Sequence, residues 1–241
     1  MNDQKRGGPD PYSKPDQSGS KSLIIVGVVV LVVVLAVVAV LMTGGGDSSV
    51  NAKSDKNTGA YAAANAVKEQ SGVTVTGEAL PPFPEVDTPL APADQDSAVG
   101  KVAPTLSGQT FDGKDMTIDP KDGRAKVVVF AAHWCPHCQV EIPKIQEWIN
   151  DGNKPDDVDF YAVSTAVQAD RPNYPPSKWI AKVGWTPPVL LDDADSHAAV
   201  AYGLTEFPFM VALNADGTVS ERGSGEIPMD QFGAMVDALQ R

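Results

Sequence analysis

The chain has 241 residues, a net charge of −12 at pH 7 and a pI of about 4.6. This acidity excludes nucleic acid as the partner, because phosphate binding needs clustered lysine and arginine side chains. Hydrophobic residues make up 42% of the chain, which is enough for one packed domain with additional segments attached to it.

Residues 23–42, LIIVGVVVLVVVLAVVAVLM, contain neither a charge nor a proline. A helix of this length spans about 30 Å, which is the hydrocarbon thickness of a bilayer. The alternative is a cleaved signal peptide, whose apolar region has about 7–15 residues and ends at a small-x-small cleavage site. The run is longer than that, and AVLMTGGG matches such a site poorly, so we expect an uncleaved membrane anchor.

Basic residues flank the predicted anchor unequally. Those before it are Lys5, Arg6, Lys14 and Lys21, and those shortly after it are Lys53 and Lys56. Because positive charge stays inside, we expect a single-pass protein of the bacterial cell membrane with a cytoplasmic N-terminus and an extracytoplasmic C-terminal part. Residues 1–22 are polar and are expected to form a disordered cytoplasmic tail.

Residues 43–99 are expected to link the anchor to a folded domain at 100–241. The first part, TGGGDSSVNAKSDKNTG, has the composition of a flexible tether. The segment LPPFPEVDTPLAP at 80–92 is too rich in proline for a helix or a central strand. It is either an extended spacer or a strap that lies against the domain.

From residue 100 onward, strand and helix patterns alternate. The predicted strands are two around the turn at Asp112-Gly113, buried runs at 126–132 and 158–164, a short run at 188–193 and a hairpin at 208–222; the predicted helices are 135–150, 175–184, 195–203 and 229–241. This order predicts an α/β domain with a mixed sheet and helices on both faces.

The only two cysteines, Cys135 and Cys138, enclose Pro136 and His137. A zinc site needs about four ligands, and the chain has no further cysteine. His133 and His137 could complete a Cys2His2 cluster, but His137 lies between the two cysteines, where the geometry would be strained, so we expect no metal. A structural disulfide here would close a very small loop and would restrict the unfolded chain little. The pattern therefore favours a redox centre.

The position of the pair supports redox chemistry. A buried strand leads into Cys135 and a helix starts there, so unpaired N–H groups and the helix dipole favour its thiolate, which is the reactive nucleophile. Cys138, one turn later, can attack a mixed disulfide, and Pro136 suits the first helical turn. His137 can add positive charge or a hydrogen bond to the thiolate, which makes the disulfide more oxidising. The disulfide is itself the redox group, so no cofactor is expected.

Three segments, GKVAPTLSGQTFDGKDMTI, VVVFAAHWCPHCQVEIPKI and YGLTEFPFMVALNADGTV, resemble the TlpA-like group of membrane-tethered thiol:disulfide proteins in the redoxin/AhpC-TSA superfamily. The resemblance implies a thioredoxin fold over 100–241 that starts with an N-terminal β-hairpin and is preceded by one transmembrane helix. It also implies a cis-proline at Pro208 that forms a peptide-binding ledge with Phe207. Trp134 is expected to face the substrate, and Glu141 to tune the cysteines.

Two departures from the group bear on the direction of electron flow. The Pro-His dipeptide between the cysteines is that of DsbA, a strong oxidant, and Val129 stands where thioredoxins carry a buried acid. We therefore expect a dithiol oxidase that acts on cysteine-containing extracytoplasmic proteins and is served by a membrane redox partner. The alternatives are a TlpA-like reductase for cytochrome c maturation and a redox-inactive binding module.

Overall fold

The computed structural model describes residues 68–240. The predicted tail at 1–22, the predicted anchor at 23–42 and the first part of the predicted linker lie outside the described residues. Within 68–240, no helix combines the length and apolar character that crossing a bilayer requires.

The centre of the domain is a five-stranded mixed sheet with the order β6-β5-β4-β7-β8. Its strands are β4 (Ala125–Ala131), β5 (Val158–Ser164), β6 (Val189–Leu191), β7 (Phe209–Leu213) and β8 (Val219–Ser224). The first three run parallel to one another, whereas β7 is antiparallel to both β4 and β8. This arrangement agrees with the predicted α/β class.

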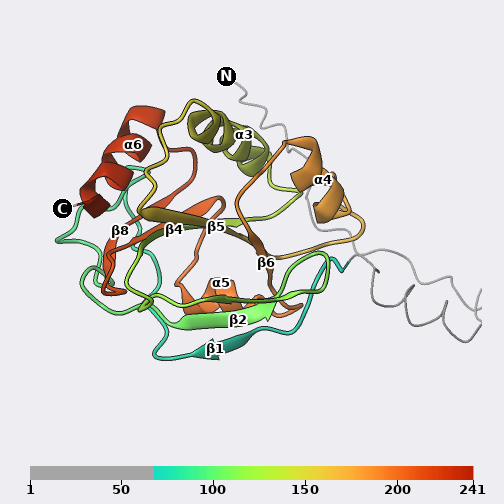
Figure 1. Cartoon of the computed structure of the whole chain (residues 1–241), viewed down its shortest axis with the longest axis horizontal. Helices are drawn as coiled ribbons and strands as arrows, with labels where there is room; N and C mark the ends of the chain where they lie inside the picture. Colours follow the sequence, from blue (N-terminus) through green and yellow to red (C-terminus); the bar gives the residue numbers. More distant parts are fainter. Residues whose placement is uncertain (1–67, 241) are drawn as a thin grey trace, which may run out of the picture. The chain divides into compact units, whose positions relative to one another are not determined.

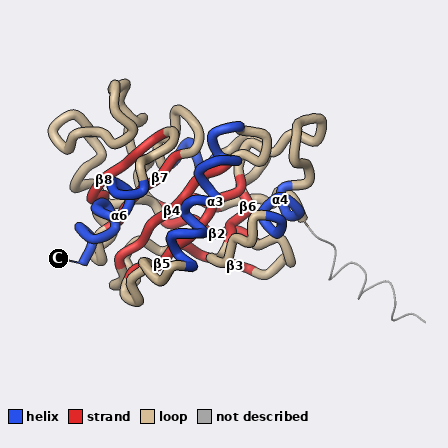
Figure 2. Tube along the Cα trace, turned by 90° about the horizontal axis from the view of Figure 1, so that it is seen from above, coloured by secondary structure: helices blue, strands red, loops and turns tan. Residues whose placement is uncertain are grey.

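Helices cover both faces of this sheet (Figure 1). They are α3 (Pro136–Asn150), α4 (Pro176–Lys182), α5 (His197–Ala201) and α6 (Met229–Asp237), followed by a single 3₁₀ turn at Ala238–Gln240. Helices α3 and α6 lie on one face and α5 lies on the other. Viewed from above, α3 runs over β4 (Figure 2), so the helix that contains Cys138 is supported by the most central strand.

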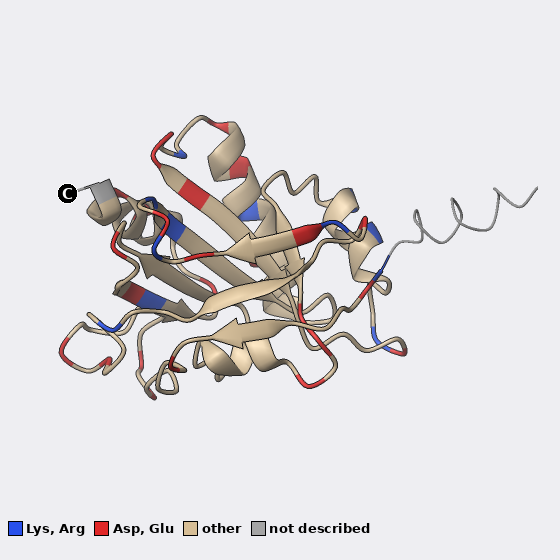
Figure 3. Ribbon diagram, turned by 60° about the horizontal axis from the view of Figure 1, so that its bottom comes forward, with Lys and Arg blue, Asp and Glu red and all other residues tan. Residues whose placement is uncertain are grey.

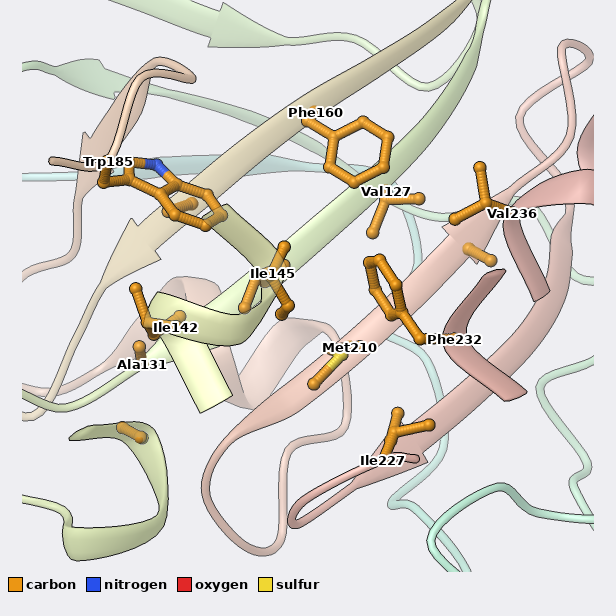
Figure 4. Close-up of a cluster of buried hydrophobic side chains, with 14 of the residues drawn as sticks. Val127, Ala131, Ile142, Ile145, Phe160, Trp185, Met210, Ile227, Phe232 and Val236 are labelled. Atoms are coloured by element: carbon orange, nitrogen blue, oxygen red, sulfur yellow. The ribbon is translucent and has the colours of Figure 1, made fainter. Parts of the chain in front are cut away.

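Strand β4 is buried along its whole length and divides two hydrophobic clusters. Val127 and Val129 face a cluster that includes Ile145 of α3 and Phe232 of α6, part of which is shown in Figure 4. Val128 faces the cluster on the opposite side. Burial on both faces explains why β4 reads in the sequence as a continuous apolar run without alternation.

A second sheet has three antiparallel strands, β1 (Thr74–Thr76), β2 (Thr105–Gln109) and β3 (Asp115–Ile118). The turn between β2 and β3 contains Gly113, whose φ of +76° is readily adopted only without a side chain. Strand β1 lies in the segment that was expected to be a linker. The folded domain therefore begins before the predicted boundary at residue 100.

The proline-rich segment at 80–92 is a strap that packs against the domain, not a free spacer. The side chains of Leu80, Phe83 and Ala91 are buried. Two strap N–H groups bond to the α5 region: that of Leu80 donates to the carbonyl of Ala201 at 2.8 Å, and that of Phe83 donates to the carbonyl of Gly203 at 2.8 Å. Prolines have no N–H group, which prevents a longer ladder, and the strap pairs with β8 through a single antiparallel bridge between Leu90 and Gly223.

Candidate active site

Cys135 occupies the junction between β4 and α3. It is the N-cap of α3, with extended backbone, and its sulfur accepts a hydrogen bond from the N–H of Cys138 at 3.4 Å. Pro136 follows in the first helical turn, where its missing N–H leaves no bond unmade. Both thiols are free, and Cys135 retains 5% of its surface exposed whereas Cys138 is completely buried.

The two thiols differ strongly in acidity. A hydrogen bond from the Cys138 thiol, followed by backbone N–H groups at the helix start, lowers the pKa of Cys135 to about 6 against the opposing effect of burial. The positive charge of His137 adds the smallest of these effects. The same thiol–thiol bond and burial raise the pKa of Cys138. At neutral pH, Cys135 is therefore the thiolate and Cys138 keeps its proton.

The residues predicted to form a substrate ledge lie beside Cys135. The peptide bond between Phe207 and Pro208 is cis, and the Cys135 sulfur lies 3.8 Å from the carbonyl oxygen of Phe207. The rings of Trp134 and Phe207 meet edge to face, with their centres 5.9 Å apart. The structure thus brings Trp134, Phe207 and Pro208 to the reactive sulfur, although they come from segments more than 70 residues apart.

His137 was expected to add either a positive charge or a hydrogen bond to the thiolate. Its hydrogen bond goes to a carboxylate instead of the thiolate. Its Nδ1 lies 3.0 Å from Glu226, whose other oxygen accepts a hydrogen bond from Lys144 at 3.0 Å. The hydrogen bond to Glu226 raises the pKa of His137, while His137 and Lys144 lower that of Glu226. The imidazole acts on Cys135 through its charge alone.

Glu141 is completely buried, although it lies on a helix that is partly exposed. One carboxylate oxygen accepts a hydrogen bond from the N–H of Ile227 at 3.0 Å, and the other has no hydrogen-bond partner and lies 3.9 Å from Lys144. Burial raises the pKa of this carboxyl. Because residues three apart share a helix face, Glu141 lies next to Cys138. A buried acid therefore follows the pair on α3, on the same helix face as Cys138, while Val129 on β4 is buried and apolar.

Two residues near the site had not been singled out from the sequence, and a third, His133, had been considered only as a zinc ligand. Glu226 bonds to His137, Arg171 stacks on Trp134 with its guanidinium carbon 4.7 Å from the ring centre, and His133 is buried directly before Trp134. The first two are separated from their partners by 89 and 37 positions, and no spacing rule connects them. His133 is adjacent to the motif, but only its buried hydrogen bonds distinguish it.

Within residues 68–240, no group of three or more histidine, cysteine, aspartate or glutamate side chains is arranged to hold a metal ion.

Several described proteins are similar in sequence to the part of the chain that contains the two cysteines. The chain is 28% identical over 159 residues to the soluble secreted antigen MPT53 of Mycobacterium tuberculosis, covering 65% of this chain and 84% of that protein. It is 25% identical over 124 residues to the sporulation thiol-disulfide oxidoreductase A of Bacillus subtilis, covering 52% of this chain and 73% of the relative. It is also 25% identical over 134 residues to the thiol-disulfide oxidoreductase ResA of Bacillus anthracis, covering 56% and 74%.

A solved structure and a family match complete the comparison. The structure of a candidate thiol:disulfide interchange protein DsbE from Chlorobium tepidum superposes with a TM-score of 0.51 at 21% identity, covering 59% of this chain and 98% of that one, which shows a shared thioredoxin-like fold. The Redoxin family matches residues 98–239, more than half of the chain. Together with the two free thiols, these matches support a general thiol-disulfide redox role. The chain belongs to the Redoxin family.

Proposed function

We propose that this chain is an extracytoplasmic thiol:disulfide oxidoreductase that oxidises pairs of cysteines in other proteins. The observation that carries the proposal is the asymmetry of the pair: the pKa of Cys135 is lowered to about 6, and that of the buried Cys138 is raised. Stabilising the thiolate stabilises the reduced form, and a couple whose reduced form is stabilised is a stronger oxidant.

The reaction runs through a mixed disulfide. A substrate thiolate attacks the sulfur of Cys135 in the oxidised enzyme, and the sulfur of Cys138 leaves and takes up a proton. A second substrate thiolate then attacks the substrate sulfur of the mixed disulfide and displaces Cys135 as a thiolate. Two electrons have passed to the enzyme and the substrate holds a new disulfide. The low pKa of Cys135 makes it a good leaving group in this last step.

The surroundings of the sulfur suit a peptide substrate. Phe207 and Pro208 provide a ledge whose carbonyl already faces Cys135, and the ring of Trp134 closes one side of it. In this proposal Pro136 and His137 adjust the stability of the thiolate. His137 does so through its positive charge, which Glu226 maintains by raising the imidazole pKa.

Glu141 favours a second candidate function, the TlpA-like reductase. A reductase needs Cys138 to lose its proton so that it can attack the mixed disulfide and release the reduced substrate. The buried carboxylate of Glu141, one turn along the same helix face, has an oxygen without a hydrogen-bond partner and a raised pKa, so it can accept that proton.

The location belongs to the same proposal. Residues 23–42 would anchor the chain in the cell membrane with the thioredoxin-like domain outside, and a membrane protein would reoxidise the reduced pair. The length and lack of charge of that run support this, and one relative is named a secreted protein. Labelling of single cysteines introduced at Ser13 and Ser220 with a membrane-impermeant maleimide on intact cells tests it. The variants also carry Cys135→Ser and Cys138→Ser, so that the introduced cysteine is the one that reacts. Labelling at residue 13 without labelling at residue 220 would contradict the orientation.

The deciding measurement is the reduction potential of the Cys135–Cys138 couple, equilibrated against glutathione. An oxidase requires a value of about −120 to −180 mV. A value of about −270 mV or below would assign the chain to the reductases and would make Glu141 the more informative residue.

Two variants test whether the pair is catalytic at all. Cys135→Ser should abolish disulfide exchange with a reduced model protein, and Cys138→Ala should accumulate mixed disulfides between Cys135 and its substrates. Full exchange activity in Cys135→Ser, together with no adducts in Cys138→Ala, would leave only a redox-inactive binding module.

A further inference from the structure

The loop between β5 and α4 is bound to the residue that precedes Trp134. The Nδ1 atom of the buried His133 lies 2.7 Å from the carbonyl oxygen of Pro172, and its Nε2 atom lies 3.2 Å from the backbone N–H of Gln168. The side chain of Asn173 donates to the His133 carbonyl at 3.2 Å. A carbonyl can only accept and an N–H can only donate, so Nδ1 of His133 donates to Pro172 and its Nε2 accepts from Gln168.

The same loop surrounds Trp134 next to the reactive cysteine. The indole N–H of Trp134 donates to the carbonyl of Ala166 at 2.7 Å. The guanidinium of Arg171 lies over the indole ring, 4.7 Å from its centre. Phe207 of the ledge meets the same indole ring edge to face. Trp134 therefore connects the ledge on one side with residues 166–174 on the other.

Arg171 is exposed and forms no ion pair with any carboxylate of residues 68–240. Stacking uses the face of a guanidinium and leaves its N–H groups free to bind a carboxylate. Figure 3 shows basic residues scattered among acidic ones, in keeping with 19 basic and 31 acidic residues in the chain. The other charges around the site are Asp170, which is exposed directly before Arg171, Glu206, which is exposed beside Phe207, and Glu226 with its two cationic partners.

We propose that residues 166–174 form a second wall of the substrate site, in which Arg171 binds a carboxylate next to the substrate cysteine. His133 is the positioning residue that holds this wall against Trp134. The proposal rests on the function proposed above and specifies its substrates: cysteines flanked by an acidic residue react better than cysteines flanked by a basic one.

The test uses the full-length chain in detergent micelles and two reduced dithiol peptides that differ only in an Asp or a Lys beside the first cysteine. The wild-type chain should oxidise the Asp peptide with a KM about threefold lower, the size expected for one exposed ion pair. Arg171→Met keeps an apolar chain on the indole ring and should remove this preference. His133→Ala should remove it as well, even though Arg171 is present.

Reaction with 2-mercaptoethanol, an uncharged thiol, and the reduction potential serve as controls, since neither depends on a carboxylate bound by Arg171, and both should be unchanged in Arg171→Met and His133→Ala. His133→Asn, whose amide can still donate to the Pro172 carbonyl, should recover part of the preference. If His133→Ala fails to fold, Arg171→Met decides alone.

Equal KM values for the two peptides in the wild-type chain, or an unchanged preference in Arg171→Met, would overturn the inference. So would a His133→Ala variant that loses reactivity with 2-mercaptoethanol in the same proportion as peptide reactivity, because His133 would then support the fold in general. A chain that exchanges with 2-mercaptoethanol and oxidises neither peptide would contradict the proposed function itself.

Discussion

The two faces of the five-stranded sheet are covered by different kinds of structure. On the face with the active site, the helices α3 and α6 pack on the sheet, and Phe232 lies among aliphatic side chains (Figure 4) and meets two aromatic rings edge to face. The opposite face is covered by the five residues of α5, the three-stranded sheet and the strap at 80–92. Helices satisfy their own backbone, so the first face is covered mainly by apolar side chains, with the polar side chains of Glu141 and Gln146 buried among them.

The strap-covered face needs a charged side chain in its interior. Arg222 is fully buried and binds Asp96 through two hydrogen bonds of 2.8 and 2.5 Å. It also donates to the carbonyls of Pro81 and Tyr202 at 2.9 and 3.0 Å. An irregular segment leaves carbonyl groups without partners, and a buried arginine has enough donors to satisfy several of them. The face covered by the irregular strap therefore contains a buried ion pair, whereas the face covered by α3 and α6 does not depend on one.

The largest loss of stability is expected when the buried ion pair under the strap is broken. Asp96→Asn should lower the free energy of unfolding by about 3–5 kcal/mol, because it leaves the Arg222 charge buried without its counter-charge. Urea unfolding of the reduced domain measures it. The matched control is the double variant Asp96→Leu/Arg222→Met, which should lose less than the single one. A loss below about 1 kcal/mol for Asp96→Asn would show that the strap does not depend on the pair.

A smaller loss is expected on the helical face. Ile145→Ala on α3 should cost about 3 kcal/mol, since it removes a fully buried side chain from a packed cluster. Val140→Ala on the same helix, where 43% of the side chain is exposed, is the control and should change stability little. Urea unfolding compares the two. Equal losses would mean that α3 is held by something other than its buried side.

The active site sits on the helical face, and its acidity can be measured without reference to stability. The rate of alkylation of Cys135 by iodoacetamide should rise with a midpoint near pH 6, because only the thiolate reacts. Cys138→Ala removes the largest cause of the lowered pKa, so its midpoint should move upward, toward that of a free thiol. A midpoint that Cys138→Ala leaves in place would assign the effect to the helix N-terminus instead.

The smallest effect concerns Glu141, where a titratable group is buried on the helical face. A carboxyl whose folded pKa is raised binds more protons when folded than when unfolded, so it lowers stability as pH rises through the interval between the unfolded and folded pKa values. Glu141→Gln removes this loss and should flatten the pH dependence of stability above pH 4.5, with a small gain at neutral pH. Urea midpoints of both proteins between pH 4 and pH 8 measure this; parallel curves would contradict it.

Local patterns predicted much of the domain. The continuous apolar run at 126–132 is β4, the helix expected at 135–150 is α3, and Cys135 caps that helix as expected. For the proline-rich segment, the sequence did not decide between a spacer and a strap. Whether a segment without a regular pattern packs against a domain depends on partners elsewhere in the chain. Its partners are residues near 201–203 and Arg222, whose charge by itself indicates an exposed side chain.

Glu141 and His133 show the same limit inside the site. On sequence grounds Glu141 stands on a helix three residues after Cys138, but its burial depends on Ile227, 86 residues later. His133 adjoins the cysteine motif, yet its partners at 168 and 172 belong to a loop with no recognisable pattern. Both side chains are polar, and polarity alone predicts exposure.

The sequence by itself determined the chemistry of the chain, because the pKa of Cys135 is lowered first by the Cys138 thiol and then by backbone N–H groups, all within three residues of it. Tertiary structure decided what surrounds that sulfur. The carbonyl of Phe207 at Cys135, Glu226 at His137 and Arg171 over Trp134 join residues that are far apart along the chain. Such contacts follow from the order and direction of strands in the sheet, which no local periodicity encodes.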